Sequence, residues 1–215
     1  MEFYNHSAIC SLATQIVLEE SWLDCDKAEI TNWRNVLGLI LIRAFSSAPN
    51  YAQTMVGTNG YPNIEVGTMI KLIEHLAPKA NLVPSFCTLE QFKLQNWISF
   101  VSSEILLHLP FFSPEPREYR KAMKQLRHSF SILDTHLQSS DYLMTKFSYS
   151  IADVFLFAVL KFAESHKFDL SEWTMLSHYK ESLSKQPAIQ RALLREENDV
   201  QLTKSFIISK GISFS

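Results

Sequence analysis

Cys10 is the residue near the start of the chain whose type and setting could do chemistry. It comes two residues before an apolar-periodic stretch, residues 12–20, which predicts a helix. A thiol at a helix N-terminus meets backbone N–H groups and the positive end of the helix dipole, and both favour the nucleophilic thiolate. Ser11 adds a hydroxyl donor, and His6 could take the thiol proton. The alternatives are a small cysteine buried for packing and a histidine on a surface loop.

The remaining titratable residues follow no other catalytic or metal-binding pattern. The seven histidines lack metal-ligand spacing, so we expect no metal site. There is no phosphate-binding loop and no G-x-S-x-G nucleophile motif. Cys10, Cys25 and Cys87 are three cysteines without C-x-x-C spacing, which indicates reduced thiols in the cytosol.

Composition narrows the class of protein further. The net charge is −2, from 20 basic and 22 acidic residues, and this balance argues against a nucleic-acid partner. Hydrophobic residues make up 47% of the 215, which is enough for a well-filled core. The most apolar run, Val36–Ile42, is too short to span a bilayer, and acidic Glu2 does not suit a signal peptide. We therefore expect a cytoplasmic protein without a membrane segment.

The elements that must position Cys10 change in character along the chain. The first part predicts alternating strands and helices, with strands at 2–5 and 26–31, helices at 12–20, 32–45 and 66–76, and a hairpin over 51–65 around an Asn-Gly turn. The centre of the second helix, 36–42, could equally be a buried strand. After a linker at 78–85 the sequence predicts only helices, over 88–109, 117–137, 151–162 and about 184–197. Ser150 and Asp153 form an S-x-x-D capping box before the third of these.

Several stretches, in this order, resemble bacterial beta-class glutathione transferases over nearly the whole chain. The first is similar to the S-P-G-A-C-S-L-A start of that class, and the others to its third-helix region, the opening of its helical domain, its capping box and its final helix. They are His6–Ala13, Ile64–Pro84, Leu89–Ile105, Ser150–Ala163 and Gln186–Glu197. The resemblance implies a thioredoxin-like α/β N-terminal domain followed by an all-α C-terminal domain, the glutathione transferase fold. It places these domains at residues 1–78 and 86–203, with a tail at 204–215.

The resemblance also implies which residues hold glutathione. Cys10, with Ser11, would contact the glutathione sulfur. Glu65 would bind the γ-glutamyl amine, and the backbone N–H of Val66 its carboxylate. Residues 52–54, which are Ala52, Gln53 and Thr54, match the family turn whose backbone pairs with the cysteinyl part. Glu65 could instead only stabilise the start of a helix.

The chain departs from the family pattern at three places near this site. The family turn carries a cis-proline, and neither Ala52-Gln53 nor Gln53-Thr54 supplies one, so a trans loop is expected because a cis bond before a non-proline residue costs roughly 2.5–4 kcal/mol. Val66 replaces a hydroxyl residue. Leu106-Leu107 replaces the family's frequent His-Lys pair, which leaves an anionic ligand without those donors.

The helical part offers further candidates for the site. Ser99 and Ser103 could donate to a ligand, including across a dimer, although a solvated or helix-bonding serine is the simpler interpretation. Five aromatic residues could line an apolar substrate cleft or belong to the core. They are Phe92, Trp97, Phe100, Phe111 and Phe112.

The resemblance implies an enzyme that uses glutathione as co-substrate. Through Cys10 it would conjugate glutathione to an apolar electrophilic small molecule, or carry out thiol-disulfide exchange on a glutathione mixed disulfide. Such proteins are usually homodimers. The alternative is a non-catalytic binding or scaffold protein of this fold that has lost glutathione, or a carrier of apolar ligands; the three departures support these alternatives.

Overall fold

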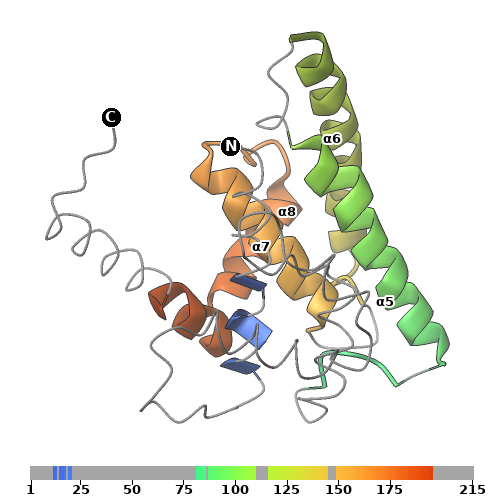
Figure 1. Cartoon of the computed structure of the whole chain (residues 1–215), viewed down its shortest axis with the longest axis vertical. Helices are drawn as coiled ribbons and strands as arrows, with labels where there is room; N and C mark the ends of the chain where they lie inside the picture. The colour runs from blue at the N-terminus through green and yellow to red at the C-terminus, as the bar shows by residue number, and fades with distance from the viewer. Residues whose placement is uncertain are drawn as a thin grey trace, which may run out of the picture.

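The computed structural model describes residues 12–13, 15–17, 19–20, 81–85, 87–109, 116–144 and 149–195. Four long helices lie in these ranges, α5 (Leu89–Phe100), α6 (Pro116–Leu137), α7 (Ile151–Ser165) and α8 (Thr174–Ser184) (Figure 1). A π-helical turn, η2 (Val101–Ile105), and a 3-10 turn, η3 (Leu106–His108), extend α5. Residues 187–195 and the described parts of 12–20 are also helical.

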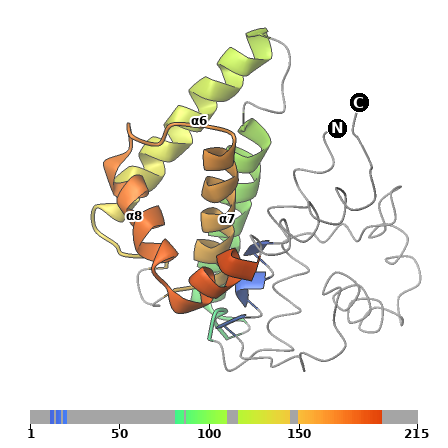
Figure 2. The ribbon, with the colours of Figure 1, turned by 90° about the vertical axis from the view of Figure 1, so that its left-hand side faces the viewer.

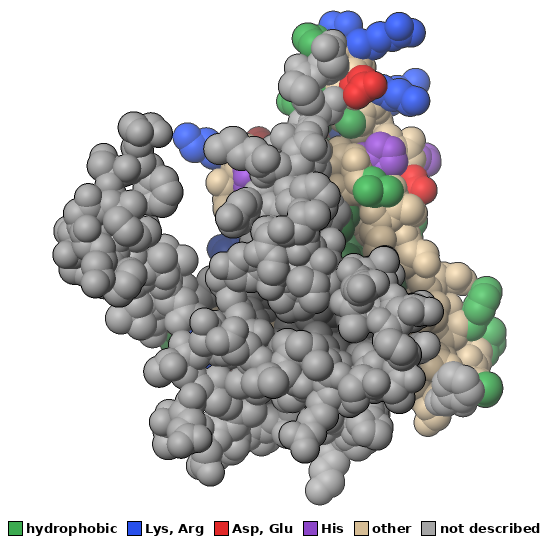
Figure 3. Space-filling model, viewed as in Figure 1, with side chains coloured by type: hydrophobic (Ala, Val, Ile, Leu, Met, Phe, Trp, Pro, Cys, Tyr) green, Lys and Arg blue, Asp and Glu red, His purple; other side chains and the backbone are tan. Residues whose placement is uncertain are grey.

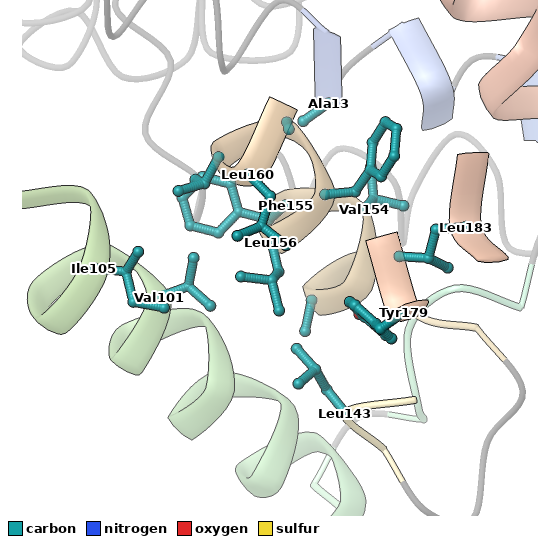
Figure 4. Close-up of a cluster of buried hydrophobic side chains, with 14 of the residues drawn as sticks. Ala13, Val101, Ile105, Leu143, Val154, Phe155, Leu156, Leu160, Tyr179 and Leu183 are labelled. Carbon is teal, nitrogen blue, oxygen red and sulfur yellow. The ribbon is translucent and has the colours of Figure 1, made fainter. Parts of the chain in front are cut away.

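Helix α7 lies at the centre of this helical part (Figure 2). Twelve of its 15 residues are buried, and all of these except Asp153 are apolar, as expected for a helix covered on all sides. The same core includes Leu12, Ala13, Ile16 and Val17 from the start of the chain. Figure 4 shows Ala13 lying over α7, while Val101 and Ile105 approach it from η2. The helix at residues 12–20, called the first helix below, is therefore attached to the helical part by apolar packing.

Helix α6 is buried along one face only. Leu126, Phe130, Leu133 and Leu137 are spaced by three and four residues and face the core, as the predicted amphipathic helix requires. Residues 116–125 include no buried residue, and this end of the helix projects from the bundle (Figure 2). Lys and Arg side chains gather there (Figure 3), a local concentration of charge that the net charge of −2 does not reveal.

The single helix predicted over 88–109 does not keep α geometry throughout. It begins as expected, with the Thr88 hydroxyl accepting from Gln91 N at 3.2 Å. After Phe100 the backbone widens into η2, where the hydroxyls of Ser102 and Ser103 donate to the carbonyls four residues earlier, at 2.8 and 2.9 Å. Such back-bonding bends helices, and a π turn adds a residue to the register. The adjacent Ile105 and Leu106 are both buried.

The capping box predicted at the start of α7 is confirmed. Ser150 donates to Oδ2 of Asp153 through its backbone N, at 2.9 Å, and through its hydroxyl, at 2.6 Å. Ile151 N also donates to the carbonyl of Leu82 at 3.0 Å. These bonds satisfy the backbone N–H groups of Ser150 and Ile151 and tie the segment before α5 to α7.

Helix α8 was not among the helices predicted from the sequence. Leu176, Tyr179 and Leu183 form its buried face, and Asp134 accepts from Leu176 N at 2.9 Å across from α6. No helix in the described part of the chain has the length and apolar character needed to cross a membrane.

Candidate functional site

Seven of the nine predicted site residues lie outside the described residues. They are Cys10, Ser11, Ala52, Gln53, Thr54, Glu65 and Val66. His6, the predicted partner of the thiol, also lies outside them. The described structure begins two residues after Cys10, at Leu12, and the helix predicted to follow Cys10 is confirmed for those of its residues that are described.

That helix is held against the core by one apolar face. Leu12, Ala13, Ile16 and Val17 are buried in the cluster that surrounds α7, and Ala13 and Ile16 have no exposed surface. Their spacing of three and four residues places them on one side of the helix. These four residues are thus part of the core of the protein, and the position of their helix depends on the helical part.

A second attachment of the same helix is ionic. The carboxylate of Glu19 accepts from Nε of Arg191 at 2.8 Å through Oε2, and from Nε of Arg195 at 2.8 Å through Oε1. A terminal nitrogen of Arg191 also donates to the backbone carbonyl of Glu19 at 3.2 Å. Sequence pattern does not reveal this contact, because Glu19 and Arg191 are 172 residues apart.

Glu20 and Tyr149 add two groups with perturbed pKa at the same boundary. Burial raises the pKa of Glu20, and the charge of Arg191 opposes this. Burial, together with the charges of Glu20 and Asp153, raises the pKa of Tyr149 far above its ordinary value, so its phenol stays protonated. The Tyr149 hydroxyl is buried and has no hydrogen-bond partner among the described residues. No sequence motif pointed to Tyr149 as a candidate.

Ser99 and Ser103, the two predicted site residues that are described, lie one turn apart and exposed. The Ser103 hydroxyl donates to the Ser99 carbonyl at 2.9 Å, and it is 3.4 Å from Oε1 of Glu104. This is the helix-bonding contact of the simpler interpretation. A direct role in ligand binding stays a prediction for both serines.

The two leucines that replace a His-Lys pair have opposite surroundings. Leu106 is buried, whereas Leu107 is 67% exposed. His108 follows at the end of η3, and its Nδ1 is buried without a hydrogen-bond partner among the described residues. No sequence pattern indicated His108 as a candidate.

The predicted aromatic set does not form one lining. Trp97 and Phe100 pack against the core, with ring centroids 5.8 Å apart in an edge-to-face arrangement. Trp97 also lies against His136, at 4.7 Å between centroids. Phe92 is exposed, and Phe111 and Phe112 lie outside the described residues. For Trp97 and Phe100 the structure supports the core interpretation.

The described residues contain no group of three or more His, Cys, Asp or Glu side chains that could hold a metal ion. They hold the helix after Cys10 by apolar packing and by the ion pairs of Glu19, and the buried Tyr149 phenol lies at the same boundary. Cys87, the free cysteine that is described, is exposed at the entry to α5.

Comparison with known proteins gives consistent results along the chain. Residues 100–187 match the family model of the glutathione S-transferase C-terminal domain. Glutathione S-transferase GstA of Escherichia coli O157:H7 is 24% identical over 208 residues, covering 91% of this chain and 98% of the relative.

Solved structures are similar over most of the chain. The glutathione transferase of Methylococcus capsulatus str. Bath is 27% identical with a TM-score of 0.65, covering 87% of this chain and 94% of that one. The bacterial transferase BphK, solved as a ternary complex, is 24% identical with a TM-score of 0.66, covering 87% and 95%. The fold predicted from the sequence is confirmed by these likenesses.

Proposed function

We propose that this chain, a member of the bacterial glutathione S-transferase family, binds glutathione and uses Cys10 to act on it. The observation that carries the proposal is the position of Cys10, two residues before a helix that is seated in the core beside α7. A thiol so placed gains thiolate character from the helix N-terminus. The relatives are named as glutathione transferases, which supports glutathione as the co-substrate.

Two reactions suit this chemistry. In conjugation, the glutathione thiolate attacks an apolar electrophilic small molecule, a carbon–sulfur bond forms, and the leaving group departs. In exchange, the Cys10 thiolate attacks the glutathione sulfur of a mixed disulfide, forms a Cys10–glutathione disulfide and releases the other thiol; a second glutathione then restores Cys10 as oxidised glutathione leaves. Exchange depends on Cys10 itself, whereas conjugation needs only a stabilised glutathione thiolate.

The resemblance to the family supplies the other site residues, the oligomeric state and the compartment of this proposal. Residues 1–78 would carry the glutathione site, with Ser11, Glu65, Val66 and the 52–54 turn around the ligand. Residues 86–203 would carry the second substrate, with Ser99 and Ser103 as donors. The protein would act as a homodimer in the cytoplasm, a compartment whose glutathione keeps thiols such as the exposed Cys87 reduced.

Calorimetric titration of glutathione into the full chain tests the proposal, with Cys10→Ala beside it and Cys87→Ser as the matched control. Binding at micromolar to low-millimolar concentration, weakened in Cys10→Ala and unchanged in Cys87→Ser, is expected. The absence of heat and of any thermal shift at several millimolar glutathione would overturn it.

A non-catalytic binding or scaffold role is the second candidate. The missing proline at residues 52–54 and the apolar Val66 favour it, as does the exposed Leu107 in place of a cationic side chain. A chain that bound an apolar dye but not glutathione would fit this role instead.

A further inference from the structure

The ionic contact of Glu19 differs from the other ion pairs of the described part of the chain by its burial. The Glu19 side chain is only 8% exposed, and each of its two carboxylate oxygens accepts from a different guanidinium. The other carboxylates in ion pairs, such as Glu164 and Glu181, are at least 44% exposed. Loss of a partner from a buried carboxylate is strongly unfavourable, whereas exposed pairs contribute little.

The two arginines are placed for this contact by one helix. Pro187 starts the helical residues 187–195, where a missing N–H carries no cost. Ala188, Ile189 and Ala192 are buried. Arg191 and Arg195 are four residues apart, so their side chains share a face of this helix and reach Glu19 together.

The apolar packing and the ionic contact of Glu19 restrain the first helix in different ways. Packing of Ala13 and Ile16 fixes which face of the helix is turned to the core, but the hydrophobic effect is non-directional and restrains small displacements of the helix less than a hydrogen-bonded contact does. The Glu19 contact is directional, because both oxygens and the backbone carbonyl are engaged by guanidinium N–H groups of fixed geometry. It therefore sets the rotation and the axial position of the helix.

We propose that Glu19, Arg191 and Arg195 form a positioning clamp that orients the helix after Cys10 and thereby sets the reactivity of the Cys10 thiol. The clamp proposal rests on the proposed function, since Cys10 is the proposed catalytic residue. Because a helix moves as a rigid unit, displacement at Glu19 would also displace Leu12, the described residue that follows Cys10 by two positions in the sequence. The three clamp residues act through the helix and need no contact with glutathione.

The test uses the full chain in a Cys25→Ser/Cys87→Ser background, so that Cys10 is the one remaining thiol. The rate of Cys10 alkylation by iodoacetamide is measured against pH, without glutathione, for Arg191→Gln, Arg195→Gln and Glu19→Gln. Lys185→Gln, which removes an exposed pair with Glu181, is the matched control. Melting temperature is recorded for every variant.

We expect alkylation at neutral pH to fall about five- to tenfold in each clamp variant and its pH profile to move to higher pH, because less thiolate is present. Lys185→Gln should match the background protein. Non-additivity in Glu19→Gln/Arg191→Gln would show that both residues act through one contact.

A clamp variant with lowered melting temperature but an unchanged alkylation profile would overturn the proposal, since the contact would then be structural only. Glutathione titration of the background protein separates this result from failure of the proposed function. If glutathione does not bind but alkylation still depends on the clamp, only the proposed function fails.

Discussion

The phenolic hydroxyl of Tyr179 in α8 donates a 2.6 Å hydrogen bond to Oδ1 of Asp153 in the first turn of α7. Leu143 N donates to the same oxygen at 2.9 Å, while Ser150 donates twice to Oδ2. Asp153 is fully buried. One carboxylate therefore joins α7, α8 and the segment between α6 and α7.

Tyr179→Phe should lower the free energy of unfolding by about 1.5–3 kcal/mol, the usual contribution of a hydrogen bond to a charged group. Burial and the charge of Asp153 raise the pKa of Tyr179, so the phenol stays protonated and donates. Urea denaturation measures the change. Tyr119→Phe, at an exposed position of α6, is the control and should have no effect; equal effects of the two substitutions would contradict the prediction.

Asp153→Asn should show a penalty that depends on pH. Burial raises the pKa of Asp153 from its ordinary 3.8, and the hydrogen bonds from Leu143, Ser150 and Tyr179 oppose but do not reverse this. Since the folded-state pKa is then the higher one, the contribution of Asp153 to stability is full below 3.8 and falls as pH rises through the folded-state pKa.

The stability lost in Asp153→Asn should therefore be largest near about pH 3 and smaller toward about pH 7. Denaturant unfolding of both proteins across this range measures the difference, which cancels titration elsewhere in the chain. A penalty that grew with pH would mean that the four donated bonds hold the carboxyl ionised and lower its pKa.

Thr88→Ala should destabilise the protein by about 1 kcal/mol through loss of the α5 N-cap. The Thr88 hydroxyl accepts from Gln91 N and donates to the Ser85 carbonyl at 2.8 Å, and alanine can do neither. Thr88→Ser keeps both bonds and should be nearly neutral. Denaturation midpoints compare the three proteins, and equal losses for Ala and Ser would argue against the cap.

Phe130→Ala should cost about 3–5 kcal/mol, because it leaves a cavity under Trp173 and Phe168. The Phe130 ring is fully buried, 5.0 Å from the Trp173 ring and 5.8 Å from the Phe168 ring between centroids. Thermal and urea unfolding followed by circular dichroism measure the loss.

Arg127→Gln, on the same helix, should cost less than about 1 kcal/mol. Arg127 pairs with Glu172, but their side chains are 52% and 55% exposed, so solvent screens the attraction. A loss comparable to that of Phe130→Ala would contradict this ranking of buried packing over exposed charge.

Local pattern predicted much of the helical part correctly. The capping box needs two residues three apart, and the buried face of α6 needs only a repeat of three and four, so both follow from neighbouring residues. The π turn after Phe100 was not predicted. Two consecutive serines in this turn donate to carbonyls four residues earlier, but periodicity alone does not distinguish a π register from an α register.

The sequence by itself determined the helix that follows Cys10 and the start of α7, because hydrophobic period and capping are properties of short segments, whereas the fold class followed from the family resemblance. Only the tertiary structure decided that Glu19 meets Arg191, 172 residues away, and that Asp153 meets Tyr179. Charged residues show no periodicity that reveals a distant partner, and burial, which makes such contacts consequential, arises only when the helices pack.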